Sequence, residues 1–320
     1  MSFKKIEIDE IRKLININNN KHFDYKLDVL YRDYQNLYFD TQFKNKSVVF
    51  KNENRIFIPL TTDPKSKLYS YYGDSIEFIS DKPIQKDDYD KIKNYFNDVK
   101  GNNIFKFKIK DEKSIIENKI KNIDRVIQEI YIDLSKSIDE IKKEFSSNVR
   151  NEIKKDYYGV SFEIVDYDNY NKDEIFNMMD LHIKISGRQT RSEKTWIQNE
   201  KMLLCKQGFL IKVIHNNKVV SFSFFYHNDT TCIYLSSVGD RDLYGKIRNM
   251  HLKSMWLAIN YVKNKCKFFY VGHLTLFSKK KLTEKQINIE KFKSKLRGIN
   301  SNFVTLSALP EYNYYKDFIG

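Results

Sequence analysis

The sequence predicts an α+β (mixed α/β) fold with two lobes, each a mostly antiparallel mixed sheet flanked by helices. Three observations lead to this prediction. The chain has 320 residues, about twice the usual size of one domain. Apolar residues make up 41% of it and aromatic residues 15%, enough for buried cores and unlike a disordered chain. Finally, β-rich runs and segments with helical spacing are interspersed along the whole sequence.

The first lobe is expected to span residues 1–128. Residues 47–60, SVVFKNENRIFIPL, predict a β-hairpin, because two β-rich runs flank the polar KNEN turn. An aromatic and β-branched stretch with a Gly-Asp turn follows, then a segment with helical spacing and a strictly alternating strand, at 68–80, 81–100 and 103–110. The end of the chain, from about residue 303 to 320, is a candidate to return to this lobe.

The second lobe is expected to span residues 129–302. Residues 137–159 start with an N-cap signal at Ser137 and then repeat apolar residues every three or four positions, which predicts one amphipathic helix. A strand and a second helix follow at 160–167 and 173–187. Residues 208–239 predict an antiparallel meander, because three β-rich runs are joined by His-Asn turns. A long helix and a buried strand follow at 249–266 and 266–272.

The charge balance bounds the partners of the protein. The net charge of +14 favours nucleic acid, nucleotide cofactors, nucleotide-linked sugars or an acidic membrane surface, although general lysine abundance also explains it. Three cysteines without a close pair predict reduced thiols, and no metal-ligand spacing is present. The start lacks a signal peptide, and no apolar run reaches about 18 residues. These features predict a cytoplasmic protein with no stable membrane insertion.

The element order of the second lobe is that of a GCN5-related N-acetyltransferase (GNAT) core. Residues 132–165 further resemble the FemABX-like proteins, in which a D-L-S-like turn precedes a helix with an R-x-x-I-K-K-like element and a Gly turn. The matching positions here are Arg150, Ile153, Lys154, Lys155 and Gly159. Residues 179–190, with Arg188, and residues 287–298, INIEKFKSKLRG, resemble later elements of the same family. In the first lobe, the resemblance covers the hairpin and the YYGD turn.

This resemblance implies an enzyme that transfers an acyl or aminoacyl group onto an amine in cell-envelope biosynthesis. It implies acyl-CoA or aminoacyl-tRNA as co-substrate, with no tightly bound cofactor, and a nucleotide-linked sugar or wall precursor as acceptor. The chain lacks the Q/R-x-x-G-x-G/A loop with which acetyltransferases hold the CoA pyrophosphate, since residues 241–245 have the wrong spacing. Acyl transfer to an amine needs no covalent nucleophile, and no nucleophile motif is found.

Several arginines are candidates for binding the phosphates of a substrate. Arg188 and Arg191 follow a helix in the turn SGRQTR, where they either contact a ligand or complement the helix dipole. Arg241, Tyr244 and Arg248 precede a helix, where an anion would also meet free backbone N–H groups. The alternative for this second group is a solvated loop.

Two further regions supply candidates. In the YYGD turn, Tyr72 is a candidate for substrate contact and Asp74 for proton acceptance, although a turn aspartate is also explained by turn structure alone. His273, directly after the last strand, is the histidine that we would test as a base. Near the C-terminus, Lys291, Lys293 and Lys295 belong to a predicted amphipathic helix with a basic face, which is either solvated or contacts donor phosphates or tRNA.

A non-catalytic protein is the alternative hypothesis. The basic composition also suits an RNA-binding or membrane-associated module, whose affinity would fall steeply with salt. The sequence shows neither a recognisable RNA-reading motif with stacking aromatics nor an obvious polybasic membrane anchor. The enzyme hypothesis therefore leads.

Overall fold

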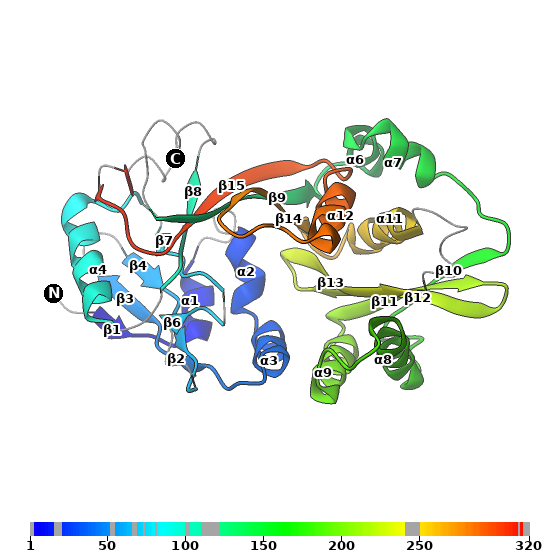
Figure 1. Cartoon of the computed structure of the whole chain (residues 1–320), viewed down its shortest axis with the longest axis horizontal. Coiled ribbons are helices and arrows are strands. Elements are labelled where there is room, and N and C mark those ends of the chain that lie inside the picture. Colours follow the sequence, from blue (N-terminus) through cyan, green and yellow to red (C-terminus); the bar gives the residue numbers. More distant parts are fainter. Residues whose placement is uncertain are drawn as a thin grey trace. The chain divides into compact units, whose positions relative to one another are not determined.

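The computed structural model of the chain consists of two compact units (Figure 1). It describes residues 3–15, 21–51, 55–65, 69–72, 74–80, 82–99, 103–109, 122–240, 250–312 and 314–315. The first unit contains residues 1–129, 273–290 and 300–320, and the second contains 130–272 and 291–299. Three strands have residues in both units: β9 (Ile123–Asp133), β14 (Phe268–Ser278) and β15 (Ile299–Leu306).

The first unit is built around a four-stranded sheet with the order β1-β3-β4-β7. A smaller sheet has the order β2-β5-β6, and β8 pairs antiparallel with β15. The strands are β1 (Phe3–Lys5), β2 (Lys44–Asn45), β3 (Val48–Lys51), β4 (Arg55–Ile58), β5 (Thr61–Thr62), β6 (Tyr69–Ser70), β7 (Ile79–Ser80) and β8 (Phe105–Ile109). The helices are α1 (Ile8–Leu14), α2 (Lys21–Leu27), α3 (Val29–Tyr38), α4 (Lys86–Asp98) and most of α12 (Glu284–Lys293).

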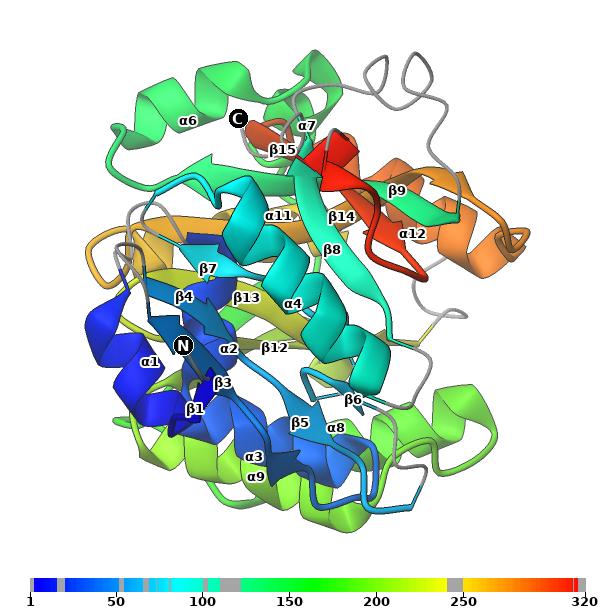
Figure 2. The ribbon, with the colours of Figure 1, turned by 90° about the vertical axis from the view of Figure 1, so that its left-hand side faces the viewer.

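Helices pack on both faces of the four-stranded sheet. Alternate residues of a strand point to opposite faces, so Val48 and Phe50 of β3 join the core beneath α4, while Val49 joins the core beneath α1. Figure 2 shows α4 running alongside β8, and both elements contribute side chains to the same core. Because both faces are covered, the hairpin strands β3 and β4 consist largely of apolar residues.

The second unit is one sheet with helices on both faces. Strands β10 (Val160–Val165), β11 (Gly208–His215), β12 (Lys218–His227) and β13 (Thr231–Gly239) pair antiparallel in sequence order, and β14 then pairs parallel with β13. The helices are α6 (Ile138–Glu144), α7 (Ser147–Glu152), α8 (Asp173–Ser186), α9 (Glu193–Leu204) and α11 (Met250–Val262). Helices α8 and α9 lie on one face of the sheet and α11 on the other (Figure 1).

The predicted fold class is confirmed, with some local corrections. The hairpin at 47–60, the helix within 81–100, the meander and the helix within 249–266 all form. The prediction of one helix within 137–159 was wrong: Phe145 is extended, and the Ser146 side chain accepts a hydrogen bond from the Val149 N–H to start α7. The C-terminal helix ends at Lys293, and Ile289 is exposed rather than in the core. Helices α1, α2, α3 and α9 were not predicted.

Gly298 closes the turn before β15 in the second unit and supplies a test of the packing. A Cβ atom at this position would lie 2.3 Å from the carbonyl oxygen of Tyr131 in β9, far inside van der Waals contact. We expect Gly298→Ala to lower the free energy of unfolding by about 1–3 kcal/mol, because a backbone oxygen cannot move aside as a flexible side chain can. Chemical denaturation measures this change.

The control for this variant is Gly187→Asn. Gly187 has φ of 67° with no atom within 4 Å of a built Cβ, and asparagine tolerates this left-handed conformation. The control should change the unfolding free energy by less than about 1 kcal/mol. Equal effects of the two substitutions would contradict the packing argument.

Candidate functional site

A pocket in the first unit contains two of the predicted site residues, Tyr72 and Asp74. Its volume is about 240 Å³. Its walls come from α2, α3 and the turn after β6, and consist of Lys26, Tyr31, Gln35, Phe39, Tyr71, Tyr72 and Asp74. The turn is tight, since the backbones of Tyr71 and Asp74 exchange two hydrogen bonds of 3.0 and 3.1 Å. This turn places the Tyr72 and Asp74 side chains at the same pocket.

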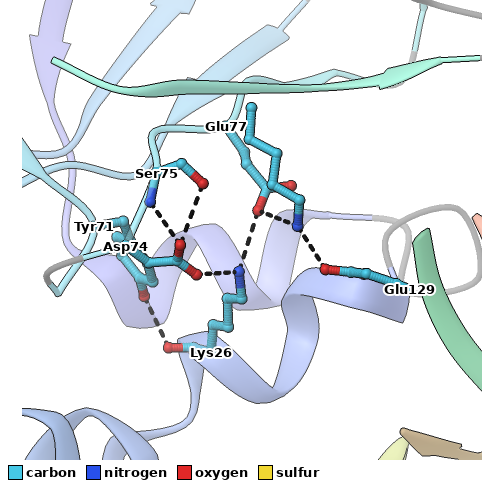
Figure 3. A network of polar contacts seen from close by, with 7 residues as sticks. Lys26, Tyr71, Asp74, Ser75, Glu77 and Glu129 are labelled. Atoms are coloured by element: carbon cyan, nitrogen blue, oxygen red, sulfur yellow. Dashed lines mark hydrogen bonds and ion pairs between the residues drawn. The ribbon is translucent and has the colours of Figure 1, made fainter. Parts of the chain in front are cut away.

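Lys26 holds the Asp74 carboxylate in place (Figure 3). Its Nζ donates to Asp74 Oδ2 at 2.8 Å, while Asp74 Oδ1 accepts from the backbone N–H and the hydroxyl of Ser75. The Tyr71 hydroxyl donates to the backbone carbonyl of Lys26 at 2.9 Å and fixes the end of α2. The Lys26 side chain is only 7% exposed, whereas that of Asp74 is 56% exposed. Asp74 therefore presents an oriented carboxylate to the pocket.

The electrostatics keep both partners charged. Loss of water contacts at the pocket wall raises the pKa of Asp74, but the charges of Lys26 and Lys106 and the hydrogen bond from Lys26 outweigh this effect and lower that pKa to about 2. Burial lowers the pKa of Lys26, but Asp74 and Glu77 outweigh it and raise that pKa well above its ordinary value. A carboxylate with so low a pKa is a weak base. The site therefore suits Asp74 better as a hydrogen-bond acceptor or counter-ion for substrate than as a proton acceptor.

Beneath the pocket, the ion pairs continue into the core of the first unit. Lys26 Nζ also lies 3.2 Å from Glu77 Oε1, and Lys106 of β8 lies 3.3 Å from the same oxygen. Lys106 then pairs with Glu129 of β9 at 2.7 Å. The side chains of Glu77, Lys106 and Glu129 are each at most 5% exposed. Buried charges of this kind persist only when they are paired, so the cluster fixes α2, the turn and two strands around the pocket floor.

Tyr72 has a strained backbone. Its φ is 49°, a left-handed conformation that a bulky residue seldom adopts. The backbone N–H of Tyr72 donates to Thr61 Oγ1 at 2.9 Å, and its ring packs edge-on against Phe43 and Tyr71, which together hold this conformation. Local strain of this kind is frequent at functional sites. Phe39, which also lines the pocket, is 48% exposed and offers an aromatic surface to a ligand.

The second unit has a different feature, a divergence of two parallel strands. β13 and β14 pair over only three residues, from Thr231–Phe268 to Ile233–Tyr270. Two residues after Ile233, the pairing of β13 with β12 shifts by one residue at Leu235, which is a β-bulge. A bulge bends its strand and increases its twist. We call the resulting gap between residues 234–239 of β13 and residues 271–272 of β14 the wedge.

Lys293 and Ser236 both lie at the strands that form the wedge. A Cβ atom built on Gly272 would be 2.5 Å from Lys293 Nζ, so the ammonium group rests against the β14 backbone where the strands have separated. Gly272 has φ of 121°, which also favours glycine. Ser236 is 6% exposed, and within the described part of the chain its buried hydroxyl makes no hydrogen bond. Such an unpaired buried group calls for a partner, and a bound ligand is one.

Within the described part of the chain, Arg188, Arg191, Lys291 and Lys295 belong to neither the pocket nor the wedge. His273, expected just after a strand ending at residue 272, lies inside β14 next to Gly272. Arg188 is exposed in the α8–α9 turn, and the Arg191 guanidinium lies 5.3 Å from the Trp196 ring centroid. Lys291 is exposed, whereas Lys295 and His273 are partly buried. Arg241, Tyr244 and Arg248 lie outside the described residues. Arg150, from the family-like motif, donates to the carbonyl oxygens of Lys143 and Phe145, so it stabilises the end of α6.

Lys26 is the residue that the sequence analysis missed. It lies in KHFDYKLDVL, which carries no motif, and its role depends on a turn 45 or more residues away. The available signal was weak: Asp28 has the N-cap pattern of α3 and in fact accepts from the Leu30 N–H at 2.9 Å. That pattern predicts a helix start next to Lys26 but not the pocket.

The chain has the tandem fold of the FemABX-like and GNAT acyltransferase structures. The sequence matches no protein-family model and no curated protein. Among solved structures, FemX is similar over 98% of this chain and 99% of its own, with 10% identity and a TM-score of 0.58. A tandem GNAT protein from the clavulanic acid biosynthesis pathway is 8% identical, with a TM-score of 0.50 over 96% of this chain and 99% of its own.

A third similar structure is a conserved protein of unknown function from Bacteroides thetaiotaomicron VPI-5482. It is 13% identical, with a TM-score of 0.50 over 96% of this chain and 99% of that chain. At these identities, the likeness establishes the fold and leaves the chemistry to be argued from the residues.

Lys106→Met tests the buried ion cluster. The substitution keeps a similar volume but removes the cation from between Glu77 and Glu129, so we expect the free energy of unfolding at pH 7 to fall by about 3–5 kcal/mol. Lys108→Met is the matched control, because Lys108 is exposed two residues further along the same strand and should cost less than about 0.5 kcal/mol. Similar losses for both variants would show that the cluster does not stabilise this unit.

The titration of Asp74 tests the electrostatics of the pocket. We expect carboxyl NMR to give a midpoint near pH 2, and Lys26→Met to raise it, because burial is then less opposed. The folded pKa is depressed, so the ion pair stabilises the fold above about pH 4, and this contribution is lost as the pH falls toward 2. Lys5→Met, at an exposed site outside the pocket lining, should leave the midpoint unchanged. A wild-type midpoint near pH 4 would refute the assignment.

Proposed function

We propose that the protein is a cytoplasmic transferase that moves an acyl or aminoacyl group from a carrier onto an amine. The carrier is aminoacyl-tRNA or acyl-CoA, and the acceptor is a nucleotide-linked sugar or a peptidoglycan precursor in cell-envelope biosynthesis. The observation that carries the proposal is the wedge between β13 and β14 in a GNAT-type sheet.

The wedge supports binding of the activated group. Where two neighbouring strands diverge, their backbone N–H and C=O groups face the gap, and an extended amide-containing segment can pair with them like an added strand. Lys293 places a positive charge against β14 at this gap. A cation so placed would stabilise either a donor phosphate or the negative charge that develops on the attacked carbonyl oxygen.

The pocket in the first unit supports binding of the acceptor. Its Asp74 carboxylate accepts hydrogen bonds from hydroxyl or ammonium groups, and the half-exposed ring of Phe39 offers an apolar face to a sugar or a base. The ammonium group of Lys26 is paired with Asp74 and Glu77 and holds the carboxylate in its orientation. Such a combination suits a ring compound with hydroxyl or amino groups better than a fatty ligand.

The reaction needs positioning more than special reagents. The neutral amine attacks the carbonyl carbon of the donor and forms the new C–N bond. The tetrahedral intermediate then expels the carrier's thiolate or ribose oxygen, which takes up the proton released by the amine. Holding both substrates in line supplies most of the acceleration, so no covalent intermediate on the chain is required.

The direct experiment is transfer from each donor class to amine acceptors. Purified protein is incubated with labelled aminoacyl-tRNA or acyl-CoA, together with amino-sugar nucleotides or wall-precursor peptides. Product formation with one donor class supports the proposal and identifies the carrier. Absence of transfer from both donor classes to every acceptor, by protein that is folded by circular dichroism, would refute it.

Two variants should affect this activity differently. Asp74→Asn should raise the acceptor KM about tenfold or more, with little change in the donor KM, because it weakens a charge-assisted hydrogen bond. Lys293→Met should lower kcat or raise the donor KM by a similar factor, depending on whether Lys293 contacts the reacting carbonyl or the carrier. Steady-state kinetics with each substrate varied separately measures these effects.

Lys143→Met is the control for charge removal at an exposed position in α6. Its kinetics should match those of the wild type within about twofold. If Asp74→Asn changed only the donor KM, or if Lys293→Met behaved like the control, the assignment of the two sites would be wrong.

A further inference from the structure

The end of β14, the following loop and the first part of α12 form a hairpin with an unusual surface. We call residues 276–289 the tip; it lies entirely in the first unit. Four large apolar side chains of the tip are exposed: Leu276 by 37%, Phe277 by 49%, Ile287 by 39% and Ile289 by 43%. Helix α12 as a whole contains no buried residue. Single exposed apolar residues are ordinary, but four within 14 residues call for an explanation.

The tip is strongly basic as well. It contains four lysines (Lys279, Lys280, Lys281 and Lys285) and one acidic residue, Glu284, which gives a local net charge of +3. All four lysines are exposed. Apolar side chains beside several lysines are the combination with which peripheral proteins bind an anionic lipid surface.

Hydrogen bonds hold the tip in a defined shape. The Thr275 N–H donates to Glu290 Oε1 at 3.1 Å, which ties the strand to the returning helix. The Lys279 N–H donates to the Asp124 carbonyl at 3.1 Å, which anchors the loop to β9. Thr283 and Gln286 cap the start of α12 with reciprocal bonds of 2.8 and 3.3 Å. The exposed residues are therefore presented by a built hairpin, drawn in orange in Figure 2.

We propose that the tip docks the protein onto the surface of an anionic lipid bilayer. The lysines would contact lipid phosphates or carboxylates, while Phe277 and Leu276 enter the headgroup region. This is peripheral attachment, and no helix in the described residues is long and apolar enough to cross a bilayer. The site is independent of the transferase proposal, because the tip includes none of the residues assigned to the pocket or the wedge.

Two other occupants suit the tip less well. A second copy of the chain would bring the lysines of one tip against those of its two-fold partner, and like charges repel across such an interface. RNA would be attracted by the lysines. Proteins that bind single-stranded RNA, however, stack its bases on aromatic side chains, whereas three of the four exposed apolar residues of the tip are aliphatic. Of these three occupants, a lipid surface is the one that matches both the aliphatic side chains and the charge.

The test is co-sedimentation of the full chain with vesicles of phosphatidylcholine alone or with about 30% phosphatidylglycerol. Binding should require the anionic lipid. Replacing Lys279, Lys280 and Lys281 with glutamine should weaken it at least about tenfold, because each lysine near the surface contributes several-fold in affinity. Replacing Leu276 and Phe277 with serine should remove the binding that persists at high salt, since that part does not depend on charge.

Matched controls have the same changes elsewhere. The control for charge replaces three exposed lysines of the second unit with glutamine: Lys143, Lys154 and Lys218. The control for apolar surface is Tyr158→Ser, which removes a fully exposed aromatic ring. Both control proteins should bind vesicles like the wild type. If the control variant with three lysines replaced lost vesicle binding to the same extent, the effect would be explained by net charge alone and the proposal would be overturned. It would also be overturned if the tip variants kept vesicle binding but lost tRNA binding or self-association.

Discussion

The parting of β13 from β14 is the constraint on which the second unit depends. A parallel pair that continued in register would satisfy its backbone groups within the sheet and leave nothing for a ligand. The extra residue at Leu235 prevents this, because it turns β13 after only three paired residues. Gly272 then allows the Lys293 ammonium group to approach the β14 backbone, which a side chain at that position would block. One bulge and one glycine thus accompany the early end of the β13–β14 pairing and the close approach of a cation to the β14 backbone.

In the first unit, ion pairs instead of backbone geometry determine how the candidate site is arranged. An exposed carboxylate that must keep one orientation needs a rigid partner, and Lys26 is rigid because it is itself paired from below by Glu77. Lys106 and Glu129 extend the chain of pairs to two strands of the unit. Replacing such a cluster with apolar residues would often stabilise a protein. Its presence beneath a pocket therefore favours a role in positioning Asp74 over a role in stability alone.

Sequence patterns predicted the parts of the fold whose signals are local. The meander was predictable because Asn216 and Asn217 adopt positive φ in a two-residue turn, and asparagine adopts this conformation more readily than most residues. The break between α6 and α7 was not, because apolar spacing continues through Phe145, whereas the Ser146 cap and the Arg150 contacts decide the geometry. Tyr72 and Asp74 could be grouped from the sequence because they share one turn, and both line the pocket. Lys26 was missed because its partners are distant in sequence.

The basic residues of the C-terminal quarter illustrate why a charge count alone does not assign function. Read as sequence, Lys279 to Lys295 form one cationic region, and one anionic ligand would explain them all. In the folded chain, these lysines have different neighbours. Lys293 rests against Gly272 where β13 and β14 diverge, whereas the lysines of the tip lie in a segment with exposed aliphatic side chains. A cation beside backbone donors is suited to a small anionic group, because both can point at it together. A cation beside exposed leucine and isoleucine is suited to a surface that is anionic outside and apolar within. On the two proposals, the same residue type would serve two kinds of ligand, and the side chains around each lysine would determine which.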